Sequence, residues 1–315
     1  MKISVVIPTY NRPDQLAEAL ESVAIQDWSV IDEVLLGDNS NAEMRDANAA
    51  VVAASPIASL IRHQPNIPPT NVTENQHALA QRARSDFFLI LHDDDRLLPG
   101  ALAALAAACE AETDPQVKVW FGRNRVMNHD GVVNMAGSAD VDRTYGKDGP
   151  AEVRPIWKWC LTQSLPPNSA LIERAAYLKH MEHPRDGNVS DWGFWVRLAN
   201  SGASGRFIPE YLWIYRAHAA SETAKGRGMD AHHWYEICRQ LNVPPEYEGK
   251  KQELLESAAV VATTRYLRDG ERRRAWDCLT SNWRWRDRLS LRGLATYAML
   301  VTPRAWWLWA LHYRG

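Results

Sequence analysis

The chain is constrained most by residues 87–95, where five apolar residues and His92 lead directly into Asp93, Asp94 and Asp95. An apolar run of this length is typical of a strand that is buried on both faces of a parallel sheet. Three adjacent carboxylates repel one another unless a positive group lies beside them, and Mg²⁺ and Mn²⁺ prefer such oxygen ligands. The pattern therefore predicts a divalent-cation site at the carboxyl end of a buried strand. An acidic turn in solvent, before the helix expected after Pro99, explains the triplet equally well.

Strands and helices alternate along the N-terminal part of the chain. Short apolar stretches predict strands at residues 3–7, 32–36, 60–62, 87–91, 117–121, 169–172 and 211–216. Apolar residues at helical spacing predict helices at residues 13–26, 41–54, 71–84, 101–111, 156–163 and 191–199. This alternation is typical of a doubly wound, mostly parallel α/β sheet with helices on its faces. Residues 128–131 are expected to form a hairpin turn, and the polar residues 137–150 a flexible loop beside the site.

Composition excludes some kinds of partner and location. The net charge of −2 over 315 residues gives no general basic surface, so nucleic acid is not an expected partner. The cysteines form no CxxC pair and are expected to be reduced thiols of a cytoplasmic protein; they are Cys109, Cys160, Cys238 and Cys278. No apolar run is long enough to cross a bilayer, and the first residues do not have the pattern of a signal peptide.

Only helices are expected beyond the glycines at 226 and 228. The chain is therefore predicted to contain an α/β domain (residues 1–225, with halves at about 1–98 and 99–225) and a helical region (residues 226–315). Residues 271–315 hold nine arginines and three acidic residues, a net charge of +6, together with six tryptophans. Arg and Trp on short helices favour an anionic membrane surface. They are equally typical of an interface with a second copy of the chain.

Polar residues follow several of the predicted strands. Residues 8–12, 37–40 and 92–95 come directly after strands, and His218 follows the strand expected at 211–216. Ligands of open α/β sheets bind beyond the carboxyl ends of the strands, so these loops could converge on one site. Each also has a structural explanation. Asn11, Asp38 and Asp191 can cap helices, and a lone His is more often structural than a ligand.

The order of these motifs resembles that of glycosyltransferase family 2. The resemblance rests on the stretches VVIPTYNR (residues 5–12), LLGDNS (35–40), LHDDD (91–95), DWGFWVRL (191–198) and YRAH (215–218). It covers about the first 220 residues, and the ordered set is far more specific than any one motif. It implies the GT-A fold, a Rossmann-like, mostly parallel sheet flanked by helices, here with a helical C-terminal extension.

The resemblance also implies roles for individual residues. The nucleotide-binding residues would be Pro8, Thr9, Tyr10, Asn11, Arg12, Asp38 and Asp93, with Asp38 on the base and Asp93 at the ribose. The ligands of a Mn²⁺ or Mg²⁺ ion would be Asp94, as the first choice, with Asp95 and His218. Asp191 would be the catalytic base. Trp192 and Trp195 would stack on acceptor sugars, although Trp195 is better explained as a core residue of an amphipathic helix.

The implied reaction is the inverting transfer of a sugar from a nucleotide-diphosphate donor, most often a UDP-sugar, to a hydroxyl of a glycan or lipid-linked acceptor in surface polysaccharide or glycoconjugate biosynthesis. The enzyme is expected in the cytoplasm, either free or on the inner face of the cell membrane. Two alternatives stay open: a nucleotidyltransferase, and a non-catalytic protein of the same fold that binds sugar nucleotides or glycans. Gly37, His92 and Glu74 depart from the family pattern and bear on the identity of the nucleotide.

Overall fold

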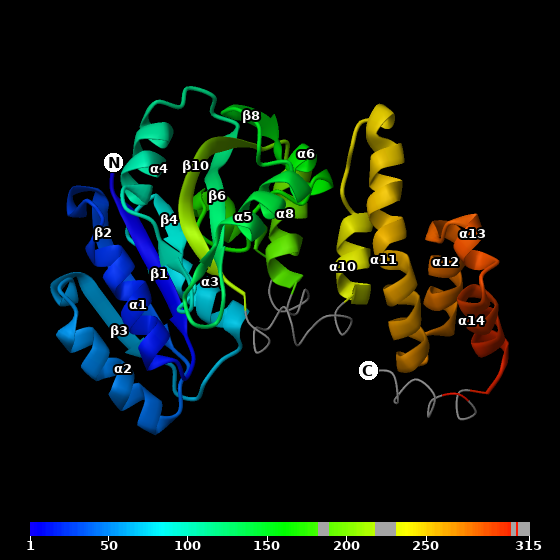
Figure 1. Cartoon of the computed structure of the whole chain (residues 1–315), viewed down its shortest axis with the longest axis horizontal. Coiled ribbons are helices and arrows are strands. Elements are labelled where there is room, and N and C mark those ends of the chain that lie inside the picture. The colour runs from blue at the N-terminus through cyan, green and yellow to red at the C-terminus, as the bar shows by residue number, and fades with distance from the viewer. Residues whose placement is uncertain (182–188, 218–230, 304–306, 308–315) are drawn as a thin grey trace.

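The computed structural model describes residues 1–181, 189–217, 231–303 and 307. An α/β part ends with strand β10 (Ser204–Arg216), and the part described from residue 231 onward consists of helices. Figure 1 shows these two parts side by side, with α10 (Ala231–Arg239) next to α8 (Ser190–Asn200). The predicted fold class is confirmed: a mixed α/β sheet is flanked by helices and followed by a helical C-terminal region.

In the described part of the chain, ten strands form one sheet, and its main path has the order β3-β2-β1-β4-β9-β6-β10-β5. β7 pairs with β6, and β8 pairs with β10. Besides β10, the strands are β1 (Ile3–Thr9), β2 (Ile31–Asp38), β3 (Ile61–Pro65), β4 (Phe87–Ile90), β5 (Arg96–Leu97), β6 (Val117–Met127), β7 (Val133–Asn134), β8 (Glu152–Pro155) and β9 (Leu171–Glu173).

The four strands at one end of the sheet are parallel, as the alternation of strands and helices predicts. The β1–β2 register pairs Pro8 with Gly37 and Thr9 with Asp38, so two of the predicted polar loops leave the sheet side by side. The other end contains both directions: β6 and β10 are parallel, whereas β9 is antiparallel to both of its neighbours. Because β9 is antiparallel to both β4 and β6, β6 and β10 run in the same direction as β1–β4. The sheet is therefore mostly parallel, as predicted, and only short strands, β5, β7, β8 and β9 among those described, run the opposite way.

Helices cover both faces of the sheet. Successive residues of β1 face different cores, as the period of two in a strand requires. Val6 belongs to a core shared with α3, α6, α7 and α8, whereas Val5 and Ile7 belong to a core shared with α1 and α4. The helices of this part are α1 (Pro13–Ala24), α2 (Ala42–Ala54), α3 (Val72–Arg82), α4 (Ala101–Glu110), α5 (Met135–Thr144), α6 (Ile156–Leu161), α7 (Arg174–His180) and α8.

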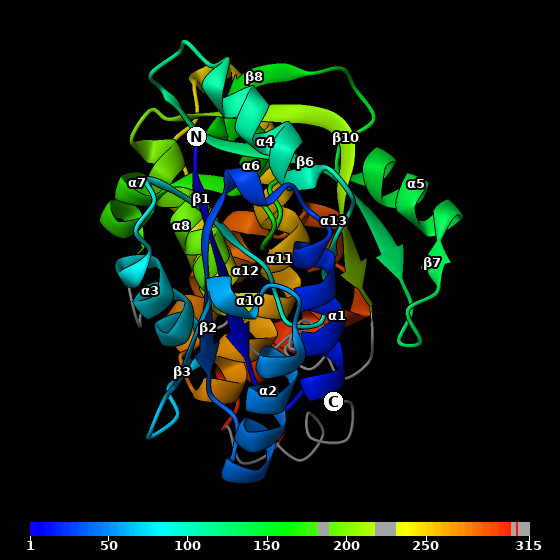
Figure 2. The ribbon, with the colours of Figure 1, turned by 90° about the vertical axis from the view of Figure 1, so that its left-hand side faces the viewer.

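Residues 137–150 do not form the expected loop: most of them belong to α5, which lies beside β7 in Figure 2. The helix begins where Asn134 Oδ1 accepts a hydrogen bond from the Gly137 N–H at 2.9 Å. Ser138 Oγ accepts one from Val126 of β6, and Asp142 accepts one from the hydroxyl of Tyr211 of β10. The prediction was wrong because these polar side chains bond to neighbouring strands and are not solvated.

The C-terminal helices are α10, α11 (Glu248–Asp269), α12 (Arg272–Asn282), α13 (Trp285–Arg288) and α14 (Leu291–Val301). They have a core of their own, centred on α11. Trp192 and Trp234 join α8 to α10, with ring centroids 5.7 Å apart, and Trp157 and Tyr247 meet at 4.7 Å. None of the described helices has the length and apolar composition needed to cross a membrane.

Candidate active site

Asn11 joins the loops that follow β1 and β2. Its backbone has a φ of 54°, a left-handed conformation that Asn adopts more readily than most residues. Its N–H donates to Ser40 Oγ at 2.8 Å, and its Oδ1 accepts from the Asn41 N–H at 3.0 Å. Because Asn41 is also the N-cap of α2, this turn fixes two strand ends and a helix start relative to one another.

Asp38 ends β2 and is fully buried. Its Oδ1 accepts from the Ser40 N–H, and its Oδ2 bonds with Asn48 and His63, all at 2.9–3.0 Å. Burial alone would raise the pKa of Asp38, but these hydrogen bonds outweigh burial and lower it to about 2. In this arrangement the carboxylate faces the interior, so contact with a nucleotide base would require one of these donors to move.

Gly37 has no side chain, and this leaves room for the side chain of Asn75 of α3. The Asn75 side chain donates to the Gly37 carbonyl at 2.7 Å, and a Cβ on residue 37 would lie only 2.1 Å from Asn75 Oδ1. Asn75 also accepts from Asn66, in the loop after β3. The glycine that departs from the family pattern is thus explained by the close approach of α3 to the end of β2.

Asp93, just after β4, is held against the end of β1. Its carboxylate accepts from Thr9 Oγ1 at 2.7 Å, from the Tyr10 N–H at 3.1 Å and from Arg12 Nη1 at 3.2 Å. Burial and the charge of Asp94 raise the pKa of Asp93 to about 6, against the lowering effect of Arg12 and the hydrogen bonds. Tyr10 is 61% exposed, whereas Pro8 and Thr9 are buried in the sheet.

The other two aspartates lie with His92 in one cluster. One ligand atom from each of His92, Asp94 and Asp95 lies within 4.8 Å of the others. Asp94 forms an ion pair with Arg12 at 2.6 Å. Burial, followed by the charge of Asp94, raises the pKa of Asp95 well above its ordinary value, while burial lowers that of His92. His92 was not among the predicted ligands, although its place directly before the triplet was the available signal.

Arg216, the last residue of β10, holds this acidic segment and was also missed by sequence reasoning. Its N–H donates to Asp95 Oδ1 at 2.8 Å, and its Nε donates to the Asp94 carbonyl at 2.9 Å. Its other guanidinium nitrogens bond to the His129 carbonyl and to Glu18 of α1. The buried Asn168 donates to the second Asp95 oxygen at 2.7 Å. Strand β10 and the segment before β9 therefore position the triplet from the side opposite to β1.

Asp191 lies in the first turn of α8. Its charge contributes, after burial, to the raised pKa of Tyr177. Helix α3 links this turn to the acidic cluster: Thr73 bonds with Ser190 at 2.9 Å, and Gln76 bonds with His92 at 3.2 Å. Because Thr73 and Gln76 are three positions apart on one helix, the start of α8 and the acidic cluster are held by adjacent turns of α3.

The two tryptophans predicted to stack on acceptor sugars lie in different surroundings. Trp192 is partly buried between the α/β core and Trp234 of α10. Trp195 is 3% exposed and packs on Phe194, as expected of a core residue, so its ring is not available to a sugar in this structure. His218 lies outside the residues that the structure describes.

The donor set of the cluster fits a hard divalent cation. Asp94 and Asp95 supply carboxylate oxygens, and the lowered pKa of His92 keeps its imidazole neutral, the form that can coordinate a metal. Burial raises the pKa of Asp93 and of Asp95, and the negative charge of Asp94 raises both further. A bound cation would relieve that repulsion.

Comparison with known proteins was made at the level of sequence and of structure. Residues 4–151 match the family model described as "Glycosyl transferase family 2". The uncharacterized protein MT1568 of Mycobacterium tuberculosis is 29% identical over 235 residues, which is 71% of this chain and 69% of that protein. The GalNAc(5)-diNAcBac-PP-undecaprenol beta-1,3-glucosyltransferase of Campylobacter jejuni is 29% identical over 104 residues, 33% of each chain.

Solved structures of glycosyltransferases share the fold. TarS of S. aureus (residues 1–349, in complex with UDP-GlcNAc) superposes with a TM-score of 0.64 at 15% identity, over 95% of this chain and 88% of that chain. The mannosyltransferase PcManGT of Pyrobaculum calidifontis, in complex with GDP-Man and Mn²⁺, gives 0.57 at 16% identity, over 99% and 84%. The chain therefore shares the GT-A fold, and its residues 4–151, which hold the acidic cluster at the carboxyl ends of β1 and β4, match the model of glycosyl transferase family 2.

Proposed function

We propose that the α/β part catalyses the inverting transfer of a sugar from a nucleotide-diphosphate donor to a hydroxyl of a glycan or lipid-linked acceptor. The observation that carries this proposal is the convergence of Thr9, Tyr10 and Arg12 on Asp93 and Asp94 at the ends of two parallel strands. The Arg12 guanidinium and the Tyr10 side chain belong to one loop beside carboxylates, which suits a nucleoside attached to a diphosphate. The glycosyl transfer that the family performs is the reaction this site is suited to.

The nucleotide would lie over the loops after β1 and β2. The exposed Tyr10 ring is a surface on which a base can stack, and Asp93 is the carboxylate nearest to a ribose placed there. Asn11 and Asp38 would act by shaping this pocket, since Asn11 bonds to Ser40 and Asp38 to buried donors. UDP-GlcNAc and GDP-Man are bound by structures of the same fold, and we propose a UDP-sugar as the first donor to test.

A Mn²⁺ or Mg²⁺ ion would be held by Asp94 and Asp95, with His92 as a further ligand. The motif YRAH suggests His218 as another ligand. When bound, such an ion neutralises charge on the leaving diphosphate. Arg12 would remain beside the ion and offer a second positive group to the phosphates, because its guanidinium already lies 2.6 Å from Asp94. The buried Arg216 and Asn168 keep the carboxylates aimed at this point.

Asp191 is the proposed general base. The acceptor hydroxyl oxygen would attack the anomeric carbon while its proton passes to an Asp191 carboxylate oxygen. The bond between the anomeric carbon and the diphosphate oxygen breaks in the same step, which inverts the anomeric configuration. Trp192, beside Asp191 on α8, would border the acceptor. The glucosyltransferase relative is named for a lipid-linked acceptor, and we propose an acceptor of that general class in surface glycan synthesis.

The organisation proposed for the chain is a catalytic domain of residues 1–225, with a nucleotide half (about 1–98) and an acceptor half (about 99–225), and a helical region from residue 226. The decisive experiment incubates the full chain with UDP-sugars and GDP-sugars in the presence and absence of Mn²⁺. Release of nucleoside diphosphate that requires the metal supports sugar transfer. Release of pyrophosphate from a nucleoside triphosphate and a sugar phosphate would support a nucleotidyltransferase instead, and binding without turnover a non-catalytic protein.

A further inference from the structure

One face of α14 exposes apolar side chains where a soluble helix normally carries polar ones. Leu291, Leu294, Ala298 and Val301 recur at intervals of three or four residues and are all exposed. Leu291 is 88% and Val301 76% exposed. The residues that face the core of the C-terminal helices are Gly293, Thr296 and Leu300, on the opposite side of the helix. We call the exposed set the α14 stripe; its helical spacing makes it one continuous apolar surface.

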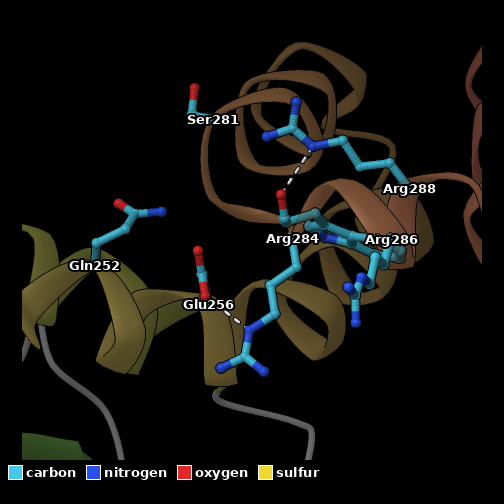
Figure 3. A pocket seen from close by; sticks show the side chains of 7 residues that line it. Gln252, Glu256, Ser281, Arg284, Arg286 and Arg288 are labelled. Atoms are coloured by element: carbon cyan, nitrogen blue, oxygen red, sulfur yellow. Dashed lines mark hydrogen bonds and ion pairs between the residues drawn. The ribbon is translucent and has the colours of Figure 1, made fainter. Parts of the chain in front are cut away.

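A cleft of about 490 Å³ lies between α11, α12 and α13, and several of its lining residues belong to the segment just before α14. Three of its lining residues are arginines, Arg284, Arg286 and Arg288, and Glu256 is its acidic one. In Figure 3, Gln252 and Ser281 lie on one side of the view and Arg286 and Arg288 on the other. The Glu256 carboxylate accepts from Arg284 Nε at 2.8 Å. With three positive groups and one negative, the cleft suits an anion with several acceptor oxygens, such as a phosphate group.

The backbone that carries these arginines is firmly anchored. The buried Trp283 donates from Nε1 to Thr263 Oγ1 of α11 at 2.9 Å, and its carbonyl accepts from Arg288 Nε at 2.8 Å. Asn282 accepts from the Tyr235 hydroxyl and donates to Gln252 Oε1 at 3.0 Å. These bonds fix the end of α12 and the start of α13 on α11, so the cleft is part of the fold of the C-terminal helices.

Helix α14 is in turn fixed on α13. A Cβ added at Gly293 would lie 2.3 Å from the Arg288 carbonyl oxygen, so the first turn of α14 packs directly on the end of α13. Ser290 caps α14 by accepting from the Gly293 N–H at 3.1 Å. The half-exposed Trp276 of α12 packs against Tyr297 of α14, with ring centroids 5.9 Å apart. The α14 stripe, the aromatic pair and the arginine-lined cleft therefore belong to one rigid unit.

We propose that this unit docks on the surface of a membrane that contains acidic phospholipids. The α14 stripe would enter the boundary between headgroups and acyl chains, and the arginine-lined cleft would take a phosphate of a lipid headgroup. An apolar helix face flanked by arginines and an aromatic residue is the pattern of helices that lie in a membrane interface. At eleven residues α14 is about 16 Å long, too short to cross a bilayer.

Charge favours a lipid surface over a second copy of the chain. Residues 271–315 carry a net charge of +6. In a symmetric dimer the same surface of both copies meets, which would bring these positive charges together. An anionic lipid surface instead offers opposite charge to the arginines and an apolar layer to the leucines.

The test uses the full chain and vesicles of phosphatidylcholine, alone or mixed with phosphatidylglycerol. We expect binding to the mixed vesicles only, weakened by salt. The double variant Arg284→Gln/Arg286→Gln should bind about 25-fold more weakly, at about fivefold for each arginine. Leu291→Ser/Leu294→Ser should also release the protein, and both variants should fold, because these side chains are exposed. The control Arg143→Gln/Arg239→Gln removes the same charge from surface ion pairs elsewhere and should bind normally.

Four results would overturn the proposal. The full chain could fail to bind the mixed vesicles, or both double variants could bind as tightly as the unchanged protein. It could form a dimer in solution that Leu291→Ser/Leu294→Ser dissociates, which would make the stripe a subunit interface. Finally, glycerol phosphate could raise the melting temperature through Arg284 and Arg286 without any vesicle binding, which would make the cleft a site for a soluble phosphate. Release of nucleoside diphosphate is measured separately without vesicles, so failure of docking and failure of sugar transfer are distinguishable.

Discussion

The backbone N–H of Arg216 donates to Asp95 at 2.8 Å, so the last residue of β10 holds the last aspartate of the acidic triplet. The guanidinium of Arg216 also donates to the Asp94 carbonyl, the His129 carbonyl and the Glu18 carboxylate. One buried guanidinium thus joins the triplet to the hairpin after β6 and to α1. The planar guanidinium carries several N–H donors that point in different directions, so it can reach all of these acceptors. A lysine ammonium cannot reproduce this geometry.

We therefore expect Arg216→Lys to lose positioning while keeping the charge. The unfolding free energy should fall by about 2–4 kcal/mol, as when a buried ion-pair network is broken. Calorimetric titration with UDP should show a loss of Mn²⁺-dependent affinity, and UDP binding without metal should change little. The control Arg143→Lys alters an exposed ion pair on α5 and should affect neither. A variant that is less stable but binds UDP and Mn²⁺ normally would limit Arg216 to a structural role.

Asp94→Ala should remove metal-dependent nucleotide binding while the fold is kept. Asp94 is the carboxylate of the cluster that pairs with Arg12, and it lies with His92 and Asp95 within 4.8 Å. Loss of a first ligand should cost at least the tenfold that loss of an outer partner costs in metal sites. Titration with UDP in the presence of Mn²⁺ measures the effect, and Asp148→Ala, an exposed aspartate, is the control. Unchanged affinity in Asp94→Ala would place the metal elsewhere.

Local patterns in the sequence were sufficient for the first half of the fold. The apolar runs at β1, β2 and β4 have no competing interpretation, because a strand buried on both faces is apolar throughout. The loops that end these strands, with Thr9, Arg12, Asp38 and the triplet, follow from the topology of a parallel sheet. The motifs of the resemblance then ordered these loops into one site.

Contacts distant in sequence could not be predicted in this way. A strand was expected at residues 169–172, but the sequence does not show that β9 lies antiparallel between β4 and β6 and brings Asn168 to Asp95. Helix α5 is polar because Ser138 and Asp142 bond to β6 and β10, which no local pattern reveals. The role of Arg216 depends on four acceptors that lie 87 to 198 positions before it in the chain. Each of these residues gains its function only when the sheet is assembled.

Gly37→Ala should destabilise the protein through Asn75. The new Cβ would lie 2.1 Å from Asn75 Oδ1, and overpacking of this kind typically costs about 1–3 kcal/mol. In an Asn75→Ala background the same change should cost at least about 1 kcal/mol less, since the clashing atom is absent. Urea unfolding of the unchanged protein, the two single variants and the double variant gives the coupling energy between residues 37 and 75. Gly149→Ala, whose Cβ would meet nothing within 4 Å, is the control, and purely additive costs would contradict the argument.

Asp38 should make stability depend on acid. Its pKa falls from the ordinary 3.8 to about 2 in the folded protein because the bonds from His63, Ser40 and Asn48 outweigh the effect of burial. The folded state therefore holds the carboxylate ionised more strongly than the unfolded state does. Its contribution to the free energy of unfolding, about 2 kcal/mol, is fully present above pH 4 and is lost as the pH falls towards 2. Subtracting the urea-unfolding profile of Asp38→Asn from that of the unchanged protein should isolate this slope. A difference that is flat from pH 5 to pH 2 would contradict the assignment.

Asp191→Asn should separate catalysis from binding. The amide has the size of the carboxylate but cannot accept the acceptor proton, so the rate of sugar transfer should fall about a hundredfold or more. Donor affinity should stay unchanged, because Asp191 belongs to α8, whose first residue is linked to the acidic cluster indirectly, through Thr73 and Gln76 of α3. Single-turnover transfer to a hydroxyl acceptor measures the rate, calorimetry measures UDP affinity, and Asp140→Asn on the exposed side of α5 is the control. Asp191→Glu should recover part of the rate if a carboxylate is what the reaction needs. Transfer by Asp191→Asn at the unchanged rate would require the base to be sought in another residue of the acceptor half.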